Sequence, residues 1–263
     1  MVAPKFIGVW SHPRSMSTSI ERCFRERGDC RCHHEPFMYY YYLERLGQPY
    51  PNFNPEDKRP RRWQDIAGML TARPDTDEKP HIFFKDMSYY IDDLHDELAD
   101  FMAATVSIFL IRDPRFTLAS YHRLDPAFSL TEGGLESQWR HLATLQRRKL
   151  PFMVIEAETI SADPASAVRA MCEFAGIPFI ADALTWGEET IPDDWEQASA
   201  WHQASMKSAG FTAPDKRDPD DVFANAVKAG PHLRDYLDHH QPYYDRLKAL
   251  AWQVGDQVSA VKA

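Results

Sequence analysis

The sequence has few cysteines, no long apolar run and no excess of positive charge. Four cysteines among 263 residues are too few for a disulfide framework, so we expect a reducing, cytoplasmic location. No stretch approaches the roughly 18 continuous apolar residues of a spanning helix, and no charged leader precedes an apolar run, so we expect neither membrane anchor nor signal peptide. The net charge of −9 argues against nucleic acid or an acidic membrane as a partner.

A short cysteine- and histidine-rich segment raises the question of a metal site. In a strand, Cys30, Cys32 and His34 would share one face. The spacing Cys-x-Cys is not the Cys-x-x-Cys of zinc sites, however, and no second pair follows later in the chain. We therefore expect no metal and interpret these cysteines as buried strand residues.

Strand and helix patterns alternate along the chain, and 44% hydrophobic residues are enough for a sizeable core. We expect strands at 6–10, 30–34, 82–85, 105–111 and 152–156. We expect helices at 92–102, 135–148 and 165–175, and a last helix from 233 to about 261 that Pro242 kinks or divides. This order predicts a single domain over residues 1–263, a three-layer α/β/α fold with a central parallel sheet.

The segment after the first strand has the features of an anion-binding loop. Arg14 follows a turn at Pro13, and four hydroxyl residues are expected in the first turn of the next helix: Ser15, Ser17, Thr18 and Ser19. Free N–H groups and the helix dipole favour a phosphate or sulfate there, and Arg14 adds a permanent charge. The loop lacks the glycine and lysine of a Walker A motif. The structural alternative is a serine-capped helix with an exposed arginine.

A second polar segment follows the strand expected at 105–111. Asp113 is a natural helix N-cap, and Pro114 suits the first helical position. Arg112 would then lie at the carboxyl edge of the sheet, where open α/β sheets bind their ligands.

These two segments together resemble a known family. Pro-Arg-Ser-x-Ser-Thr after the first strand, and Arg-Asp-Pro with Ser120 eight positions after Arg112, are similar to the cofactor motifs of the sulfotransferase superfamily. The resemblance implies a P-loop-NTPase-like fold that binds 3′-phosphoadenosine 5′-phosphosulfate (PAPS). It places the 5′-phosphosulfate on the first motif, at Arg14, Ser15, Ser17, Thr18 and Ser19. It places the 3′-phosphate on Arg112 and Ser120. Met16 stands where the family usually has glycine.

The resemblance also implies, more loosely, a late loop that covers the 3′-phosphate. In the segment 201–211, Lys207 and Gly210 are the candidates for this loop. The alternative for Lys207 is a lysine exposed to solvent.

Sulfuryl transfer needs a base for the acceptor's proton. Glu35 follows the second strand and resembles the glutamate base of some sulfotransferase branches. Its structural alternative is a helix-capping acid before Pro36. Histidine serves as the base in other branches, so His12, His33 and His34 are rivals. Lys85 ends the third strand at the same edge and would contact either the sulfonate, the acceptor or a neighbouring acid.

We therefore interpret the chain as a PAPS-dependent sulfotransferase that acts on a hydroxyl or amine of a small molecule, with Arg14 and Glu35 as the catalytic residues. The first alternative is a non-catalytic protein that binds PAPS or another nucleotide. The second is a P-loop phosphotransferase in which Asp113 holds Mg²⁺, although the Gly-Lys-Ser/Thr sequence is absent. The sequence shows no segment that indicates an oligomeric state.

Overall fold

The computed structural model describes residues 3–49, 58–73, 78–187, 195 and 208–258. Five parallel strands form one sheet in the order β2-β3-β1-β4-β5. The strands are β1 Phe6–Ser11, β2 Cys30–His34, β3 His81–Met87, β4 Val106–Ile111 and β5 Phe152–Glu156. All five expected strands are present, and β2 and β5 have the expected bounds.

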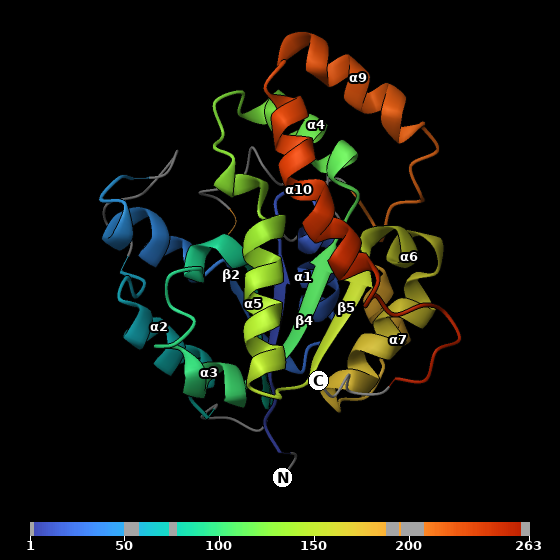
Figure 1. The fold of residues 1–263 in the computed structure, drawn as a ribbon. Coiled ribbons are helices and arrows are strands. Elements are labelled where there is room, and N and C mark those ends of the chain that lie inside the picture. The colour runs from blue at the N-terminus through green and yellow to red at the C-terminus, as the bar shows by residue number, and fades with distance from the viewer. Residues whose placement is uncertain (1–2, 50–57, 74–77, 188–194, 196–207, 259–263) are drawn as a thin grey trace.

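Helices cover both faces of this sheet (Figure 1). The α-helices are α1 Ser17–Glu26, α2 Trp63–Thr71, α3 Ala99–Ala104, α4 Pro114–Leu124, α5 Leu135–Arg147, α6 Ala157–Ala162, α7 Pro164–Ala175, α9 Pro219–Ala229 and α10 Leu233–Lys248. Shorter helical segments are the π-helix η1 Tyr40–Arg45 and the 3₁₀ turns η2 Ser88–Ile91, η3 Thr131–Gly133 and η4 Ala181–Leu184. The predicted three-layer α/β/α architecture is confirmed.

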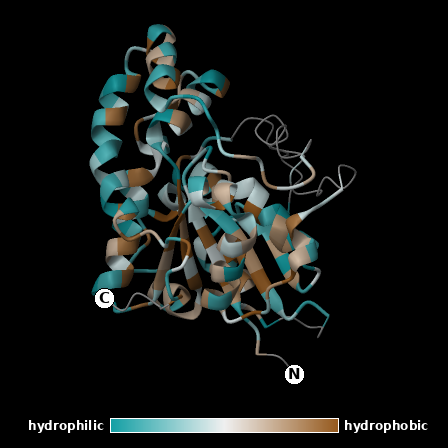
Figure 2. Ribbon diagram, turned by 90° about the vertical axis from the view of Figure 1, so that its right-hand side faces the viewer, coloured by the Kyte–Doolittle hydropathy of each residue, from teal (hydrophilic) through white to brown (hydrophobic). Residues whose placement is uncertain are grey.

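Each face of the sheet has its own hydrophobic core. Residues of α2, α3, α5 and α10 pack on one face, and residues of α1, α6 and α7 pack on the other. The hydrophobic residues accordingly run along the strands and the inward sides of the helices (Figure 2). A third, smaller cluster joins α4 to α9 and the start of α10, beyond the end of the sheet (Figure 1).

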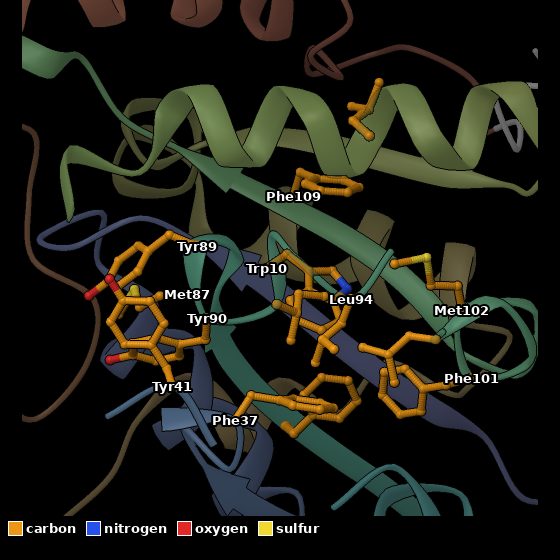
Figure 3. Close-up of a cluster of buried hydrophobic side chains, with 14 of the residues drawn as sticks. Trp10, Phe37, Tyr41, Met87, Tyr89, Tyr90, Leu94, Phe101, Met102 and Phe109 are labelled. Atoms are coloured by element: carbon orange, nitrogen blue, oxygen red, sulfur yellow. The ribbon is translucent and has the colours of Figure 1, made fainter. Parts of the chain in front are cut away.

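The first core is unusually aromatic next to the carboxyl end of β1. Trp10 meets Phe84 edge-on with 5.3 Å between ring centroids. Tyr41 meets Tyr89 edge-on at 5.2 Å (Figure 3). Such edge-to-face pairs add about 0.5–1.5 kcal/mol each beyond the area they bury. The tyrosines of the run that starts at Tyr39 therefore serve largely as core residues.

Two expected helices have different bounds in the structure. Of the helix expected at 92–102, only the last residues belong to α3. The residues before Ala99 form turns that bury Leu94 and Leu98, because the aspartates among them are poor helix formers. The last helix stops at Lys248, after which Ala251 bridges to β5. Pro242 lies inside the single helix α10, where burial of Tyr244 and Leu247 offsets its lost hydrogen bond.

His141 of α5 is a fully buried histidine in the aromatic core. Its ring lies edge-on to Trp10 at 4.5 Å, and within the described part of the chain neither ring nitrogen has a hydrogen-bond partner. Burial, and after it the neighbouring His95, holds the pKa of His141 well below its ordinary value. The imidazole is therefore neutral in the folded protein.

This neutral histidine predicts a measurable pH dependence of stability. Below about pH 6.5 the unfolded chain protonates His141 and the folded protein does not, so falling pH favours unfolding. In His141→Phe, the free energy of unfolding should fall less steeply with falling pH, by up to about 1.4 kcal/mol per pH unit. Urea unfolding of both proteins at about pH 7 and about pH 5 measures the two slopes, and equal slopes would contradict this interpretation.

Candidate functional site

The loop between β1 and α1 has a strained backbone that the sequence only partly predicts. Arg14 has φ of 67° and Met16 has φ of 76°, both in the left-handed region. Met16 thus adopts the conformation that glycine accommodates freely, at a cost of about 1–2 kcal/mol. The helix begins at Ser17, so Ser15 lies in the loop and not in the first helical turn as expected. The hydroxyl of Ser15 donates to the His12 carbonyl at 2.7 Å.

The start of α1 has the features of an anion site. Its N-cap residue, Met16, offers no side-chain hydrogen bond to the first turn. Ser17 and Ser19 are buried at this end of the helix. The N–H groups and positive dipole of the ten-residue helix are therefore directed toward the loop.

The loop after β4 has the predicted form. Asp113 caps α4 by accepting the Arg115 N–H at 2.9 Å, and Pro114 occupies the first helical position. Both carboxylate oxygens of Asp113 are also held by the Arg115 guanidinium. These contacts leave Asp113 poorly placed to bind Mg²⁺, which argues against the phosphotransferase alternative.

The two loops meet across the sheet, as β1 and β4 are neighbours. Arg14 Nε donates to Ser120 Oγ at 3.1 Å, and Arg112 Nη1 donates to the Arg14 carbonyl at 3.1 Å. Three residues predicted from two motifs about 100 positions apart thus lie together. This junction is also the point at which the chain crosses from one side of β1 to the other, where doubly wound sheets bind ligands.

Positive charge is concentrated at this junction. Burial, and after it the guanidinium groups of Arg123 and Arg112, lowers the pKa of Arg14. Two further guanidinium groups therefore act on the buried Arg14, and an anion bound there would be stabilised by all three. The Arg112 guanidinium lies 3.9 Å from the Glu158 carboxylate.

His12 connects the two loops and is not a candidate base. Its side chain is fully buried, and its Nε2 accepts the backbone N–H of Arg112 at 3.1 Å. Burial, with a contribution from Arg112, lowers the pKa of His12 to about 3. Gly134 has φ of 79° and fits closely beneath His12, because a Cβ there would lie 2.8 Å from the His12 Cβ.

Glu35 lies at the carboxyl end of β2, next to the end of β3. Its carboxylate forms an ion pair with Lys85 and accepts the Tyr90 hydroxyl at 2.9 Å. It does not cap a helix through its side chain, because η1 begins five residues later with Tyr39 as its N-cap. Burial raises its pKa, but Lys85 and then His34 and Tyr90 outweigh burial and lower it. Glu35 is therefore a carboxylate.

Lys85 is fully buried, and of the contacts considered for it the structure has the one with a neighbouring acid. The register of the sheet pairs His34 with Lys85, which brings Glu35 beside the ammonium group. The partner of Lys85 is thus Glu35, and neighbouring Asp86 instead accepts the Phe37 N–H at 2.9 Å. Burial raises the pKa of Asp86 well above its usual range.

Sequence reasoning missed Tyr90 and Glu21, which contact the two catalytic candidates Glu35 and His34. Glu21 is a fully buried acid on α1 whose Oε2 lies 2.6 Å from His34 Nδ1. The sequence does indicate that Glu21 is buried. It lies on the same helical face as Ser17 and Phe24, and the amphipathic pattern of the helix buries that face.

Two further candidates, Lys207 and Gly210, belong to the predicted covering loop. Lys207 lies outside the described residues, and Gly210 forms an isolated bridge with Thr185. The four cysteines are free thiols, and no group of three metal-ligating side chains occurs within the described ranges. Among the helices described, none is long and apolar enough to cross a membrane.

The family model for the sulfotransferase domain matches residues 5–251, which is nearly the whole chain. The chain belongs to the sulfotransferase domain family. The resemblance of the two motifs is therefore confirmed at the level of the family.

Solved structures show the same fold. The sulfotransferase domain from the curacin biosynthetic pathway is 15% identical, with a TM-score of 0.56 over 87% of this chain and 98% of that domain. The sulfotransferase domain of the Synechococcus PCC 7002 olefin synthase is 16% identical, with a TM-score of 0.50 over 86% of this chain and 94% of that domain. At these identities the likeness shows the fold alone.

Two Arabidopsis thaliana relatives carry different names. They are branched-chain-amino-acid aminotransferase-like proteins 1 and 2, which are 27% and 28% identical over 98% and 96% of this chain. The match covers 49% and 47% of their lengths. The chain thus spans about half the length of these relatives.

Proposed function

We propose that this sulfotransferase-family chain transfers a sulfuryl group from PAPS to a hydroxyl or amine of a small-molecule acceptor. The observation that carries the proposal is the junction of Arg14, Arg112 and Ser120 at the start of α1. It combines a helix N-terminus with a local excess of positive charge in a chain of net charge −9. Such a site fits an anion with two phosphate-like groups.

The two loops suit the two ends of the donor. Arg14 with Ser15, Ser17, Thr18 and Ser19 would hold the 5′-phosphosulfate, and Arg112 with Ser120 would hold the 3′-phosphate. PAPS supplies an activated sulfuryl group when bound. Arg14 would then stabilise the negative charge that grows on the leaving phosphate, in the way that positioned cations assist phosphoryl transfer. Lys207 and Gly210 stay proposals for the covering loop.

Glu35 would take the proton of the acceptor. As a carboxylate at the same sheet edge, it is in the form that accepts a proton, and Lys85 and Tyr90 fix its position.

Free cysteines throughout are consistent with a reducing cytoplasm.

A non-catalytic nucleotide-binding role is the second candidate. It is favoured by one observation, that both oxygens of the Glu35 carboxylate already have partners. Turnover measurements separate the two candidate functions. An enzyme and a non-catalytic binding protein would both bind the nucleotide, but only the enzyme would transfer the sulfuryl group.

The assignment of the 3′-phosphate predicts a selective loss in Arg112→Ala. Calorimetry should show wild type binding adenosine 3′,5′-bisphosphate more tightly than adenosine 5′-monophosphate. The variant should lose about 1.5–3 kcal/mol of bisphosphate binding, or roughly 10- to 150-fold in affinity, and much less of monophosphate binding.

The matched control is Arg148→Ala, which removes an arginine paired with the highly exposed Asp96. Its affinities should equal those of wild type. Equal losses for both nucleotides in Arg112→Ala would show that Arg112 supports the loop through its bond to Arg14 and does not recognise the 3′-phosphate.

A further inference from the structure

Glu132, on the turn η3, is an acidic side chain near the proposed site. Its Oε1 accepts the Tyr42 hydroxyl at 3.1 Å, and its Oε2 accepts the N–H of Ser129 at 2.6 Å and the Ser129 hydroxyl at 2.8 Å. It thus reaches back to Ser129 as the acid of a capping box does, which fixes its position. Glu132 is partly exposed, and it forms no ion pair with any arginine, lysine or histidine among the residues described.

Other acids in this part of the molecule do have cationic partners. Asp92 pairs with Arg140 at 2.9 Å, and Asp93 pairs with Arg45 at 3.2 Å. The arginines nearby are therefore already matched by aspartates. The charge of Glu132 is left over, and a bound cation would balance it.

Glu132 lies against a tyrosine cluster, which consists of Tyr41, Tyr42, Tyr89 and Tyr90. Ring centroids are 5.0 Å apart for Tyr41 and Tyr42 and 4.7 Å apart for Tyr89 and Tyr90. The hydroxyl oxygens of Tyr41, Tyr89 and Tyr90 lie together at one end of the cluster (Figure 3). Burial, and after it the charge of Glu132, raises the pKa of both Tyr41 and Tyr42. These side chains are therefore neutral phenols, whose ring faces attract cations.

The tyrosine cluster connects Glu132 to the proposed base. Tyr90 donates to Glu35 at 2.9 Å, Tyr42 donates to Glu132, and the centroids of these two rings are 6.0 Å apart. The turn η3 also ends at Gly134, which packs closely against the first loop. An acceptor whose nucleophilic atom lies at Glu35 would therefore have Glu132 within the reach of a small molecule.

A fixed carboxylate beside tyrosine rings is the chemistry that recognises an ammonium group. We propose that the acceptor is a small alcohol with an ammonium group, which binds to Glu132 and the tyrosine cluster while its hydroxyl lies at Glu35. This inference rests on the proposed sulfuryl transfer and names the class of its acceptor. The nucleophile is then the hydroxyl, because an ammonium nitrogen has no free electron pair.

The transfer step balances with this acceptor. The hydroxyl proton joins the Glu35 carboxylate as the oxygen's electron pair forms the bond to sulfur. The bond from sulfur to the phosphate oxygen of PAPS breaks, and its electron pair leaves with adenosine 3′,5′-bisphosphate. The ammonium group neither gains nor loses a proton, so Glu132 keeps its charged partner throughout.

Matched pairs of alcohols test the inference on the wild-type protein. Each pair consists of a hydroxyalkyl-trimethylammonium ion and the neutral alcohol with carbon in place of nitrogen, over a series of alkyl chain lengths. Calorimetry in the presence of adenosine 3′,5′-bisphosphate should show the best cation binding about 10-fold or more tightly than its neutral counterpart. With PAPS as donor, kcat/KM should show the same preference.

Glu132→Gln should remove this preference. The glutamine oxygen can still accept from Ser129, so the turn and the fold should be retained. Affinity for the cation should fall to that for the neutral alcohol, and affinity for the neutral alcohol should stay as in wild type. The matched control is Glu44→Gln, which removes the same charge from an exposed position on η1 and should keep the preference.

Three results would overturn the inference. They are equal affinity of wild type for cation and neutral alcohol at every chain length, an unchanged preference in Glu132→Gln, and an equal loss of preference in Glu44→Gln. The first needs no variant, so it decides the matter even if Glu132→Gln does not fold. Failure of the proposed function would look different: no alcohol would be sulfated, while calorimetry would still show whether the cation is preferred.

Discussion

Arg14→Ala should abolish most of the transfer activity while weakening nucleotide binding far less. Arg14 contacts the second motif twice. Its Nε donates to Ser120 Oγ, and its backbone carbonyl accepts from the Arg112 guanidinium. Charge on the leaving group grows as the S–O bond breaks, so an arginine there stabilises the transition state more than the bound donor. Turnover should fall by about 100-fold or more, as on removal of one oxyanion donor.

Arg14→Lys is the informative partner of this variant. A lysine keeps the charge but cannot reproduce the planar guanidinium that bonds Ser120, so it should recover part of the activity. Steady-state turnover and calorimetry with adenosine 3′,5′-bisphosphate would be measured on both proteins. Normal turnover in Arg14→Ala would rule out its catalytic role.

Glu35→Gln should reduce turnover by about 10²- to 10⁴-fold, because glutamine keeps the shape of the side chain and removes its basic form. Affinity for adenosine 3′,5′-bisphosphate should stay close to wild type. The structure adds an expectation about stability: Lys85 would be left buried without a charged partner, which costs about 3–5 kcal/mol. A lower melting temperature therefore does not distinguish a base from a structural acid.

The double variant Glu35→Gln/Lys85→Met makes that distinction. It removes the unpaired ammonium group, so stability should return toward wild type. If Glu35 is the base, transfer stays lost in the double variant. If Glu35 only neutralises Lys85, transfer returns together with stability, and the base must be sought at His33 or His34.

The sequence predicted the sheet and the start of α4 well because those signals are local. All five strands were predicted, four of them from apolar runs, and Asp113-Pro114 marked the start of α4. Helix ends were less predictable: tertiary contacts decide that α10 stops at Lys248 and runs through Pro242. The left-handed backbone of Met16 was also hidden, because glycine is the residue that usually signals it.

The proton-handling side of the site depends on contacts between distant segments. Glu35 meets Lys85 only because β2 and β3 pair in one register, and Glu21 meets His34 only because α1 packs behind β2. Residue spacing carries no information on either pairing. Sequence patterns could therefore name Glu35 and His34 as candidates, but they could not show that one chain of contacts joins them to Glu21.

The most direct test of this account is transfer of radiolabelled sulfur by the wild-type protein. PAPS labelled in its sulfuryl group would be incubated with a panel of small hydroxyl- and amine-bearing acceptors, and labelled product would be separated and counted. The account predicts a labelled acceptor and one equivalent of adenosine 3′,5′-bisphosphate, with no requirement for ATP. Tight binding of the bisphosphate without any labelled product across the panel would contradict it and leave a nucleotide-binding protein in its place.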